Sequence, residues 1–172
     1  MHKAIVSLIV VSFLLLVPGM AQDEKNLNQI YFAKVKAGKA LEFEESLKKH
    51  MAWLGAQGEK WTWAVWSRVA GEDLSVYAIG SFGHDFAELD AHGSMAIRNR
   101  QHWLETAGQY VESISGRLAV SRPAISKTPA TDGPPAMAWV IEQQLKVGSE
   151  QEFSHLAKQI TEAITKAGWP VH

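Results

Sequence analysis

The sequence predicts an α+β fold with one antiparallel sheet and the element order βαββαβ. Segments rich in aromatic and β-branched residues alternate with segments whose apolar residues recur every three or four positions. Two of the strand-like segments are joined only by the turn Gly71-Glu72-Asp73, which is typical of a hairpin. Of the 172 residues, 47% are hydrophobic and 20% are charged, which is the usage of a globular domain and excludes a disordered chain.

The first strand is expected over residues 29–36, which read Q-I-Y-F-A-K-V-K. Ala37-Gly38 ends this strand, and a helix is expected over residues 39–57. The helix has an apolar stripe with charged residues on either side of it, and two glycines mark its end. The stripe consists of Phe43, Leu47, Met51 and Leu54, and the glycines are Gly55 and Gly58.

The hairpin comes next, with strands expected over residues 61–70 and 74–82. A helical stretch over 84–114 follows, with a break around Gly93, and a short fourth strand is expected over 116–121. This order of elements over residues 27–121 is the ferredoxin-like split βαβ pattern. The later part of the helical stretch has one apolar face, made by Ile97, Trp103, Leu104, Ala107, Val111 and Ile114.

Both faces of the predicted hairpin are apolar. Trp61, Trp63 and Val65 alternate with Thr62, Ala64 and Trp66, so large aromatic side chains point to each side of the sheet. Two helices cover only one face of a ferredoxin-like sheet, and the other face would leave aromatic residues in water. We therefore expect self-association through the aromatic sheet face, or contact with another sheet.

Residues 1–21 have the layout of a secretory signal peptide. A basic start is followed by an apolar run over residues 4–17, and Gly19 and Ala21 are the small residues of a cleavage site. The apolar run is about 14 residues long, which is shorter than the roughly 20 needed to span a bilayer. The sequence predicts cleavage after Ala21, a periplasmic or secreted mature chain, and no membrane association after cleavage.

Residues 122–135 read as a linker, because four prolines and a glycine cannot continue a helix or a central strand. Residues 136–172 after it repeat part of the first unit at an offset of 110 residues, with a strand expected over 138–147 and a helix after it. Six identities in 33 positions are compatible with a tandem repeat or with convergent amphipathic patterning. The second unit is incomplete, so the chain is either a fragment or a protein that uses a half-unit.

Composition excludes several classes of function. Lys plus Arg is 17 and Asp plus Glu is 18, so the net charge of −1 gives no general attraction to nucleic acid. There is no cysteine, which excludes a disulfide scaffold, a thiol nucleophile and a Cys-ligated metal site. Histidines at i and i+2 or i and i+4 do not occur, and phosphate-binding loops are absent. We expect no metal site and no cofactor.

The segment S-F-G-H-D-F-A-E-L-D-A-H-G-S at 81–94 resembles the dimeric α+β-barrel superfamily, in particular domains similar to antibiotic-biosynthesis monooxygenases. The resemblance rests on Phe82 at the end of the third strand, on Asp85 and Ala87 at the helix start, and on Ala91-His92 at its end. It implies that two units pair their sheets face to face. The superfamily includes cofactor-free oxygenases, haem-degrading proteins, dehydratases and members without known activity, so the fold does not imply an enzyme.

His84 and His92 are the candidate catalytic residues, because histidine exchanges protons near neutral pH and both residues are expected at the barrel mouth. On one straight helix they would lie about 12 Å apart, too far to share a metal ion. The alternatives are a helix-start residue beside Asp85 and a helix-end residue before Gly93. A catalytic His92 would face a cavity close to Trp63, Trp66 or Tyr77. The favoured alternative places its ring in solvent or against a backbone carbonyl.

Trp63, Trp66 and Tyr77, together with Trp61, are candidates for an aromatic pocket that binds a flat apolar molecule. The alternative is that they form the core and an interface between sheets. Arg98, with Arg100 and His102, is a candidate for gripping a carboxylate, and the alternative is a solvated helix face. His50 lies on the stripe of the first helix and is expected to be a partly buried histidine bonded to a neighbour.

Three functions remain open from the sequence. The domain binds a small apolar or aromatic molecule without converting it, or it is a structural module whose aromatic face is wholly interface. The third is a cofactor-independent enzyme, monooxygenase-like or lyase-like, that uses a histidine at the barrel mouth.

Overall fold

The computed structural model of the chain describes residues 25–93, 95–126, 136–138 and 140–168. The predicted signal peptide and most of the predicted linker therefore lie outside the described residues. The elements follow the predicted order. They are β1 (Leu27–Val35), α1 (Ala40–Ala56), β2 (Ala64–Ser67), β3 (Val76–His84), α2 (Phe86–Gly93), α3 (Ala96–Glu105), the 3₁₀ turn η1 (Ala107–Tyr110), β4 (Val111–Val120), the 3₁₀ turn η2 (Pro123–Ile125) and α4 (Glu150–Lys166).

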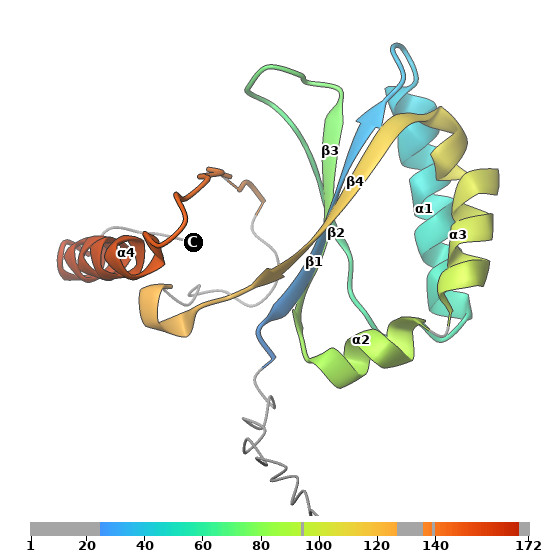
Figure 1. Cartoon of the computed structure of the whole chain (residues 1–172). Coiled ribbons are helices and arrows are strands. Elements are labelled where there is room, and N and C mark those ends of the chain that lie inside the picture. Colours follow the sequence, from blue (N-terminus) through green and yellow to red (C-terminus); the bar gives the residue numbers. More distant parts are fainter. Residues whose placement is uncertain (1–24, 94, 127–135, 139, 169–172) are drawn as a thin grey trace, which may run out of the picture.

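The four strands form one antiparallel sheet in the order β2-β3-β1-β4 (Figure 1). β1 pairs with β3 on one side and with β4 on the other, so Phe32 lies opposite both Ala78 and Ser115. β2 and β4 are the edges of the sheet. This is the strand order of a ferredoxin-like fold, and the predicted α+β class is confirmed.

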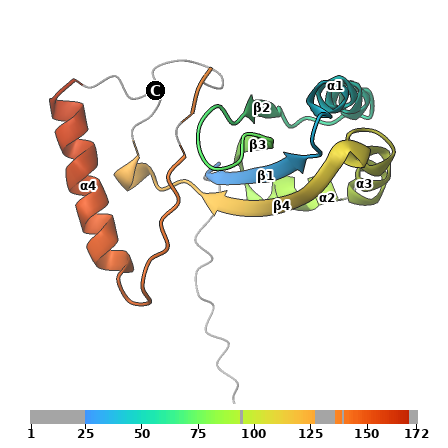
Figure 2. The same cartoon turned by 90° about the horizontal axis from the view of Figure 1, so that it is seen from above.

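Helices α1 and α3 lie on the same side of the sheet (Figures 1 and 2). The core lies between these helices and the sheet, where Phe43 of α1 packs on Tyr77 of β3 with ring centroids 4.9 Å apart. Trp103 of α3 packs edge-on against Phe43, which places it in the core as expected. The buried residues of this cluster are Ala33, Val35, Phe43, Leu47, Tyr77, Ile79 and Ala107.

The opposite side of the sheet is also apolar, and we call it the uncovered face. It is formed by Ile30, Phe32, Trp66, Phe82 and Arg117. Trp66 and Phe82 meet edge to face at 6.0 Å, Phe82 is 48% exposed, and the guanidinium of Arg117 lies 5.5 Å from the Phe32 ring. In the described part of the chain α4 stands apart from this face (Figures 1 and 2).

Two boundaries differ from the sequence prediction. β2 is limited to residues 64–67, because only these pair with β3, and residues 61–63 approach the sheet without joining the ladder. The helical stretch ends at Glu105 and not at residue 114. Thr106 leaves helical geometry with φ −118° and ψ −103°, and β4 begins at Val111. Ile114, which was expected on a helix stripe, is therefore part of β4.

The predicted second unit forms only in part. Its helix is present as α4, and Gly148 before it has a positive φ of 87°. No strand forms among the described residues of 136–147, so the strand expected over 138–147 is not found there, and the second copy is not confirmed. Among the helices of the described residues, none is long and apolar enough to cross a bilayer.

His50 of α1 and His102 of α3 face each other, with their Nδ1 atoms 2.8 Å apart. One ring must donate and the other must accept, so a hydrogen bond requires at least one neutral imidazole. His50 is buried at 3% exposure, as a histidine bonded to a neighbour. Burial, followed by the nearby His102, lowers the pKa of His50 from 6.5 to about 4, and a hydrogen bond to Asn99 opposes this shift.

We expect this pair to make stability depend on pH. The unfolded chain binds a proton at His50 below pH 6.5, whereas the folded chain does so only near pH 4. Stability is therefore full above pH 6.5 and falls as the pH decreases, by roughly 3 kcal/mol in total near pH 4. Urea unfolding between pH 4 and pH 7.5 measures this dependence. A His50→Gln variant should flatten it, whereas His155→Gln on exposed α4 should not. Equal slopes for all three proteins would contradict the prediction.

Candidate functional site

The indole of Trp61 lies between the imidazole rings of His84 and His92. The ring centroid of His84 is 3.7 Å from that of Trp61 and the planes differ by 13°. The ring of His92 lies 4.2 Å away and its plane differs by 5°. Two rings this close over one face of the indole would occupy the same volume, so the histidines cover opposite faces. The structure thus brings together both predicted catalytic candidates, separated by the thickness of one indole.

The path of the chain between the histidines explains this arrangement. β3 ends at His84, where Gly83 has a positive φ of 75°, a conformation that favours glycine. Helix α2 then begins with a capping box. Asp85 Oδ1 accepts the Glu88 backbone N–H at 2.7 Å, and Glu88 Oε2 accepts the Asp85 backbone N–H at 3.3 Å. Two turns of α2 bring His92 back over Trp61, which one straight helix over 84–92 would not do.

His84 is buried at 7% exposure, and its ring nitrogens are engaged by protein groups. Ser81 Oγ donates to the Thr62 carbonyl at 2.9 Å, so it accepts from His84 Nε2–H at 2.7 Å. His84 Nδ1 lies 3.3 Å from Glu88 Oε2, and Lys25 Nζ donates to the other oxygen of Glu88 at 2.6 Å. The Lys25 ammonium holds the pKa of Glu88 below its ordinary value. His84 therefore anchors the site and has no nitrogen left for a ligand.

His92 is held by a different carboxylate. Its Nδ1 lies 2.7 Å from Glu59 Oε2, a contact that is an ion pair only when the imidazole is protonated and whose geometry is not that of a hydrogen bond. Glu59 Oε1 accepts the Trp61 backbone N–H at 2.9 Å, and the Glu59 side chain is only 7% exposed. The Nδ1 atom is buried. The Nε2 atom is not buried, and it makes no hydrogen bond within the described residues. Nε2 is thus the accessible nitrogen of the pair of histidines.

The end of α1 sets the position of Glu59. Gly58 has φ 83° and donates its N–H to the Gly55 carbonyl, while the N–H of Glu59 reaches back to Leu54. These two bonds form a Schellman motif, which turns the chain toward the sheet. The carboxylate of Glu59 is consequently placed between the end of α1, the start of β2 and the last turn of α2.

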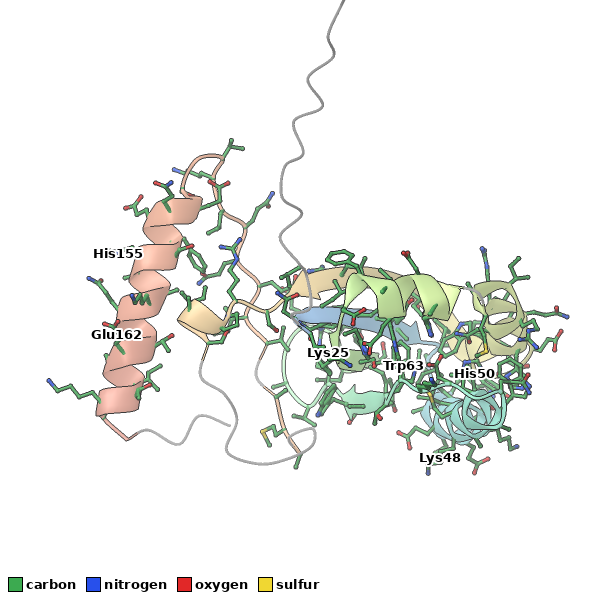
Figure 3. All side chains as sticks on the ribbon, turned by 90° about the horizontal axis from the view of Figure 1, so that it is seen from below. Lys25, Lys48, His50, Trp63, His155 and Glu162 are labelled. Atoms are coloured by element: carbon green, nitrogen blue, oxygen red, sulfur yellow. The ribbon has the colours of Figure 1, made fainter. Side chains whose placement is uncertain are left out.

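An open groove of about 570 Å³ runs along this cluster. Trp61, His84 and His92 line it, together with Phe82 and Met95. Lys25, Glu59, Lys60 and Glu88 add charged groups of both signs. In Figure 3 the labelled Lys25, Trp63 and His50 follow one another along the sheet and helices, while His155 and Glu162 belong to the separate helix α4. The groove can accept a small molecule with both apolar and polar parts.

The predicted aromatic pocket is not a single site. Trp63 and Tyr77 lie on the helix-covered side of the sheet, whereas Trp66 lies on the uncovered face. Tyr77 donates to Glu44 at 2.7 Å, and burial together with this bond raises the pKa of Tyr77 to about 12. Trp63 contributes to the edge of the site, since its ring lies 6.1 Å from His92. The structure therefore separates the three residues that were grouped from the sequence.

The basic cluster on α3 is also dispersed. Arg98 is exposed and reaches Gln57 at the end of α1, with 3.4 Å between Nη1 and Oε1. His102 turns toward α1, where it stacks on Trp53 at 4.2 Å and contacts His50. Arg98 does not line the groove. Within the described residues, no group of three or more His, Asp or Glu side chains could hold a metal ion.

Sequence reasoning missed Glu59, Ser81 and the Lys25–Glu88 pair. The signal for Glu88 was present, because D-F-A-E after a strand is a capping-box pattern. Glu59 follows a helix-ending glycine and precedes Trp61 by two residues, which suggests a local backbone contact but not a partner on α2. The role of Ser81 could be predicted only with knowledge of the sheet register, since its hydrogen-bond partners are Thr62 and His84.

No family model and no curated protein matches the chain. A structure from Caulobacter crescentus, provisionally assigned as an antibiotic biosynthesis monooxygenase, is 17% identical with a TM-score of 0.45, covering 58% of this chain and 92% of that one. An uncharacterised NIPSNAP domain protein from Burkholderia xenovorans is 16% identical with a TM-score of 0.44, covering 56% and 95%. A NIPSNAP family protein from Agrobacterium tumefaciens is 14% identical with a TM-score of 0.46, covering 56% and 86%. These similarities concern the fold alone.

Proposed function

We propose that the domain binds a small aromatic molecule with a polar substituent in the groove beside Trp61. The observation that carries this proposal is the accessible Nε2 of His92, on a ring held between Trp61 and Glu59. Because contacts with Trp61 and Glu59 already fix the His92 ring, its Nε2 can form a hydrogen bond to a ligand at little further cost in side-chain entropy. Both faces of Trp61 are occupied, so the ligand lies against the edge of the stack and contacts the exposed parts of Phe82 and Met95.

The test uses 2-naphthol, a flat molecule with one ionisable hydroxyl, titrated into ¹⁵N-labelled protein. We expect saturable shifts of the Trp61 indole signal and of backbone signals in residues 58–62 and 83–92. His92→Gln should weaken binding about fivefold, because one hydrogen bond contributes about 1 kcal/mol. His155→Gln on α4 is the matched control and should bind as the unchanged chain does. Shifts confined to other regions, or no saturable shift, would refute the groove as the binding site.

A second candidate is a cofactor-independent enzyme of the oxygenase or lyase class, in which His92 removes a proton from the bound molecule. It is favoured by the 2.7 Å contact between Glu59 and His92 Nδ1, because a carboxylate stabilises the imidazolium formed when Nε2 takes a proton. His84 is unsuited to this role, since both of its nitrogens face protein groups.

Oxygen consumption with 1,4-dihydroxynaphthalene tests the enzymatic candidate. We expect uptake above the rate in buffer, loss of this excess in His92→Gln, and a lower kcat in Glu59→Gln with probe affinity retained. A fall in the rate of oxygen uptake by 10²-fold or more would match the contribution of general-base catalysis, which is about 10²–10⁴-fold. Uptake equal to that in buffer, with binding of 2-naphthol intact, would leave a binding domain and exclude this oxidation.

We also propose that the chain is exported and that cleavage follows Ala21, on the basis of the basic, apolar and small-residue pattern of residues 1–21. Intact-mass analysis of protein recovered from the periplasm or medium checks this. The expected mass is that of a chain beginning at Gln22. A mature mass that includes residues 1–21 would contradict the proposal.

We extend the proposal to assembly, in which two copies associate through the uncovered face. It is supported by the half-exposed Phe82, by Trp66 beside it, and by the cation–π contact of Arg117 with Phe32. Contiguous apolar patches of this kind mark interaction surfaces. The face lies on the opposite side of the sheet from the core, so a second copy would not disturb the packing of α1 and α3.

A further inference from the structure

We propose that residues 140–147 of one chain add to the free edge of β4 in a second copy, as a fifth antiparallel strand in the register set by Arg117 and Glu142. This docking rests on the self-association proposed above. It adds a second contact surface between the two copies. It uses two segments that pair with no further strand within the described residues, the outer edge of β4 and residues 140–147 before α4.

Within the residues that the structure describes, β4 is a ten-residue edge strand that pairs with β1 on one side. Its apolar side chains are half-exposed, with Ile114 at 48% and Leu118 at 55%. A long edge strand with exposed apolar residues presents unpaired N–H and C=O groups to another strand. β4 can therefore accept a further strand along most of its length.

Residues 140–147 read V-I-E-Q-Q-L-K-V and have the composition of a strand, yet none of them is in a strand. Their apolar side chains are exposed, with Val140 at 64%, Ile141 at 71%, Leu145 at 40% and Val147 fully exposed. A strand needs a neighbouring strand for its backbone hydrogen bonds, so this segment stays irregular until it meets an edge.

One side-chain contact within the chain, between Arg117 and Glu142, supplies the register that we propose. Arg117 Nη1 lies 2.7 Å from Glu142 Oε1, and both side chains are more than half exposed. Antiparallel pairing with Arg117 opposite Glu142 places Leu118 opposite Ile141 and Ile114 opposite Leu145. These four apolar residues would share the helix-covered side, while Ser115 and Gln144 would lie on the other side with the ion pair. A shift by one residue would lose every one of these matches.

The position of α4 favours a second copy over pairing within the chain. Thr161 Oγ1 donates to the Ile125 carbonyl at 3.0 Å, and Arg122 contacts Ser154 at 3.3 Å, so α4 is held beside η2 at the end of β4. In this arrangement residues 140–147 remain unpaired although Arg117 already contacts Glu142. Arg117 also belongs to the uncovered face, so a copy that covers that face stands beside β4. A reciprocal exchange of segments gives a closed twofold dimer.

Charge reversal tests the pairing in the full-length mature chain, by analytical ultracentrifugation. In Arg117→Glu and in Glu142→Arg, every predicted pair becomes a like-charge pair, and we expect the dimer Kd to rise about tenfold or more. An equimolar mixture of the two variants restores opposite charges at both contacts of a heterodimer, so the mixture should regain the original Kd. Both residues are exposed, so circular dichroism should show both variants folded.

The other outcomes are decisive. Recovery only in the double variant, and not in the mixture, would place the pairing within one chain and overturn the exchange. Dimerisation unaffected by either variant, but lost in Trp66→Ser, would overturn the fifth strand and leave the uncovered face as the interface. A monomer at all concentrations would remove self-association itself, whereas the binding of 2-naphthol would stand separately.

A disulfide gives an independent check, because the chain has no cysteine. Leu118→Cys in one chain and Ile141→Cys in another would occupy directly opposite positions, where cross-strand Cβ atoms lie about 4.5–5.5 Å apart. Mild oxidation of the mixture should give a covalent heterodimer. The matched pair Leu118→Cys with Gln144→Cys points to opposite sides of the sheet and should cross-link at least tenfold less; equal cross-linking would refute the register.

Discussion

Both helical crossovers of this fold run on the same side of the sheet, and this constraint determines where every other feature lies. β1 and β2 are parallel with β3 between them, and β3 and β4 are parallel with β1 between them. Right-handed connections in opposite directions along the sheet place α1 and α3 on one face. One face therefore becomes the core around Phe43 and Tyr77, and no helix of the described residues covers Phe32 and Trp66 on the other face (Figure 1).

The candidate site depends on how the chain leaves this sheet at one end of β3. Gly83, the capping box of Asp85 and Glu88, and the short α2 return the chain over the strand that it has just left. Trp61 is held there because it precedes the ladder of β2 and is free to insert between two imidazole rings. The two histidines then differ in chemistry through their neighbours alone. Ser81 and Glu88 occupy the nitrogens of His84, whereas Glu59 leaves Nε2 of His92 accessible.

The sequence predicted the element order and the alternation of the hairpin correctly, because periodicity records which side chains share a face. It did not predict where the helix after Ala96 ends, since Ile114 fits a helical stripe and a strand equally well. The alternative favoured for His92, in solvent or against a carbonyl, does not describe its place beside Trp61 and Glu59. That contact joins residues 33 positions apart, and local patterns carry no information on such pairs. The grouping of Trp66 with Trp63 and Tyr77 failed for a different reason, because it combined the two faces of one sheet although strand alternation already placed Trp63 and Trp66 on opposite faces.

Residues 140–147 show that strand propensity alone does not produce a strand. Their composition favours a strand, and the helix that follows them forms as expected, because a helix makes its hydrogen bonds within itself whereas a strand needs another strand. The outer edge of β4, where we propose that this segment docks, lies at the far side of the sheet from β2, about 14 Å away by strand spacing. The groove near Trp61 is built around the start of β2 and the end of β3. The proposed ligand binding and the proposed assembly therefore share Phe82, whereas His92 belongs only to the groove and Arg117 only to the assembly surfaces.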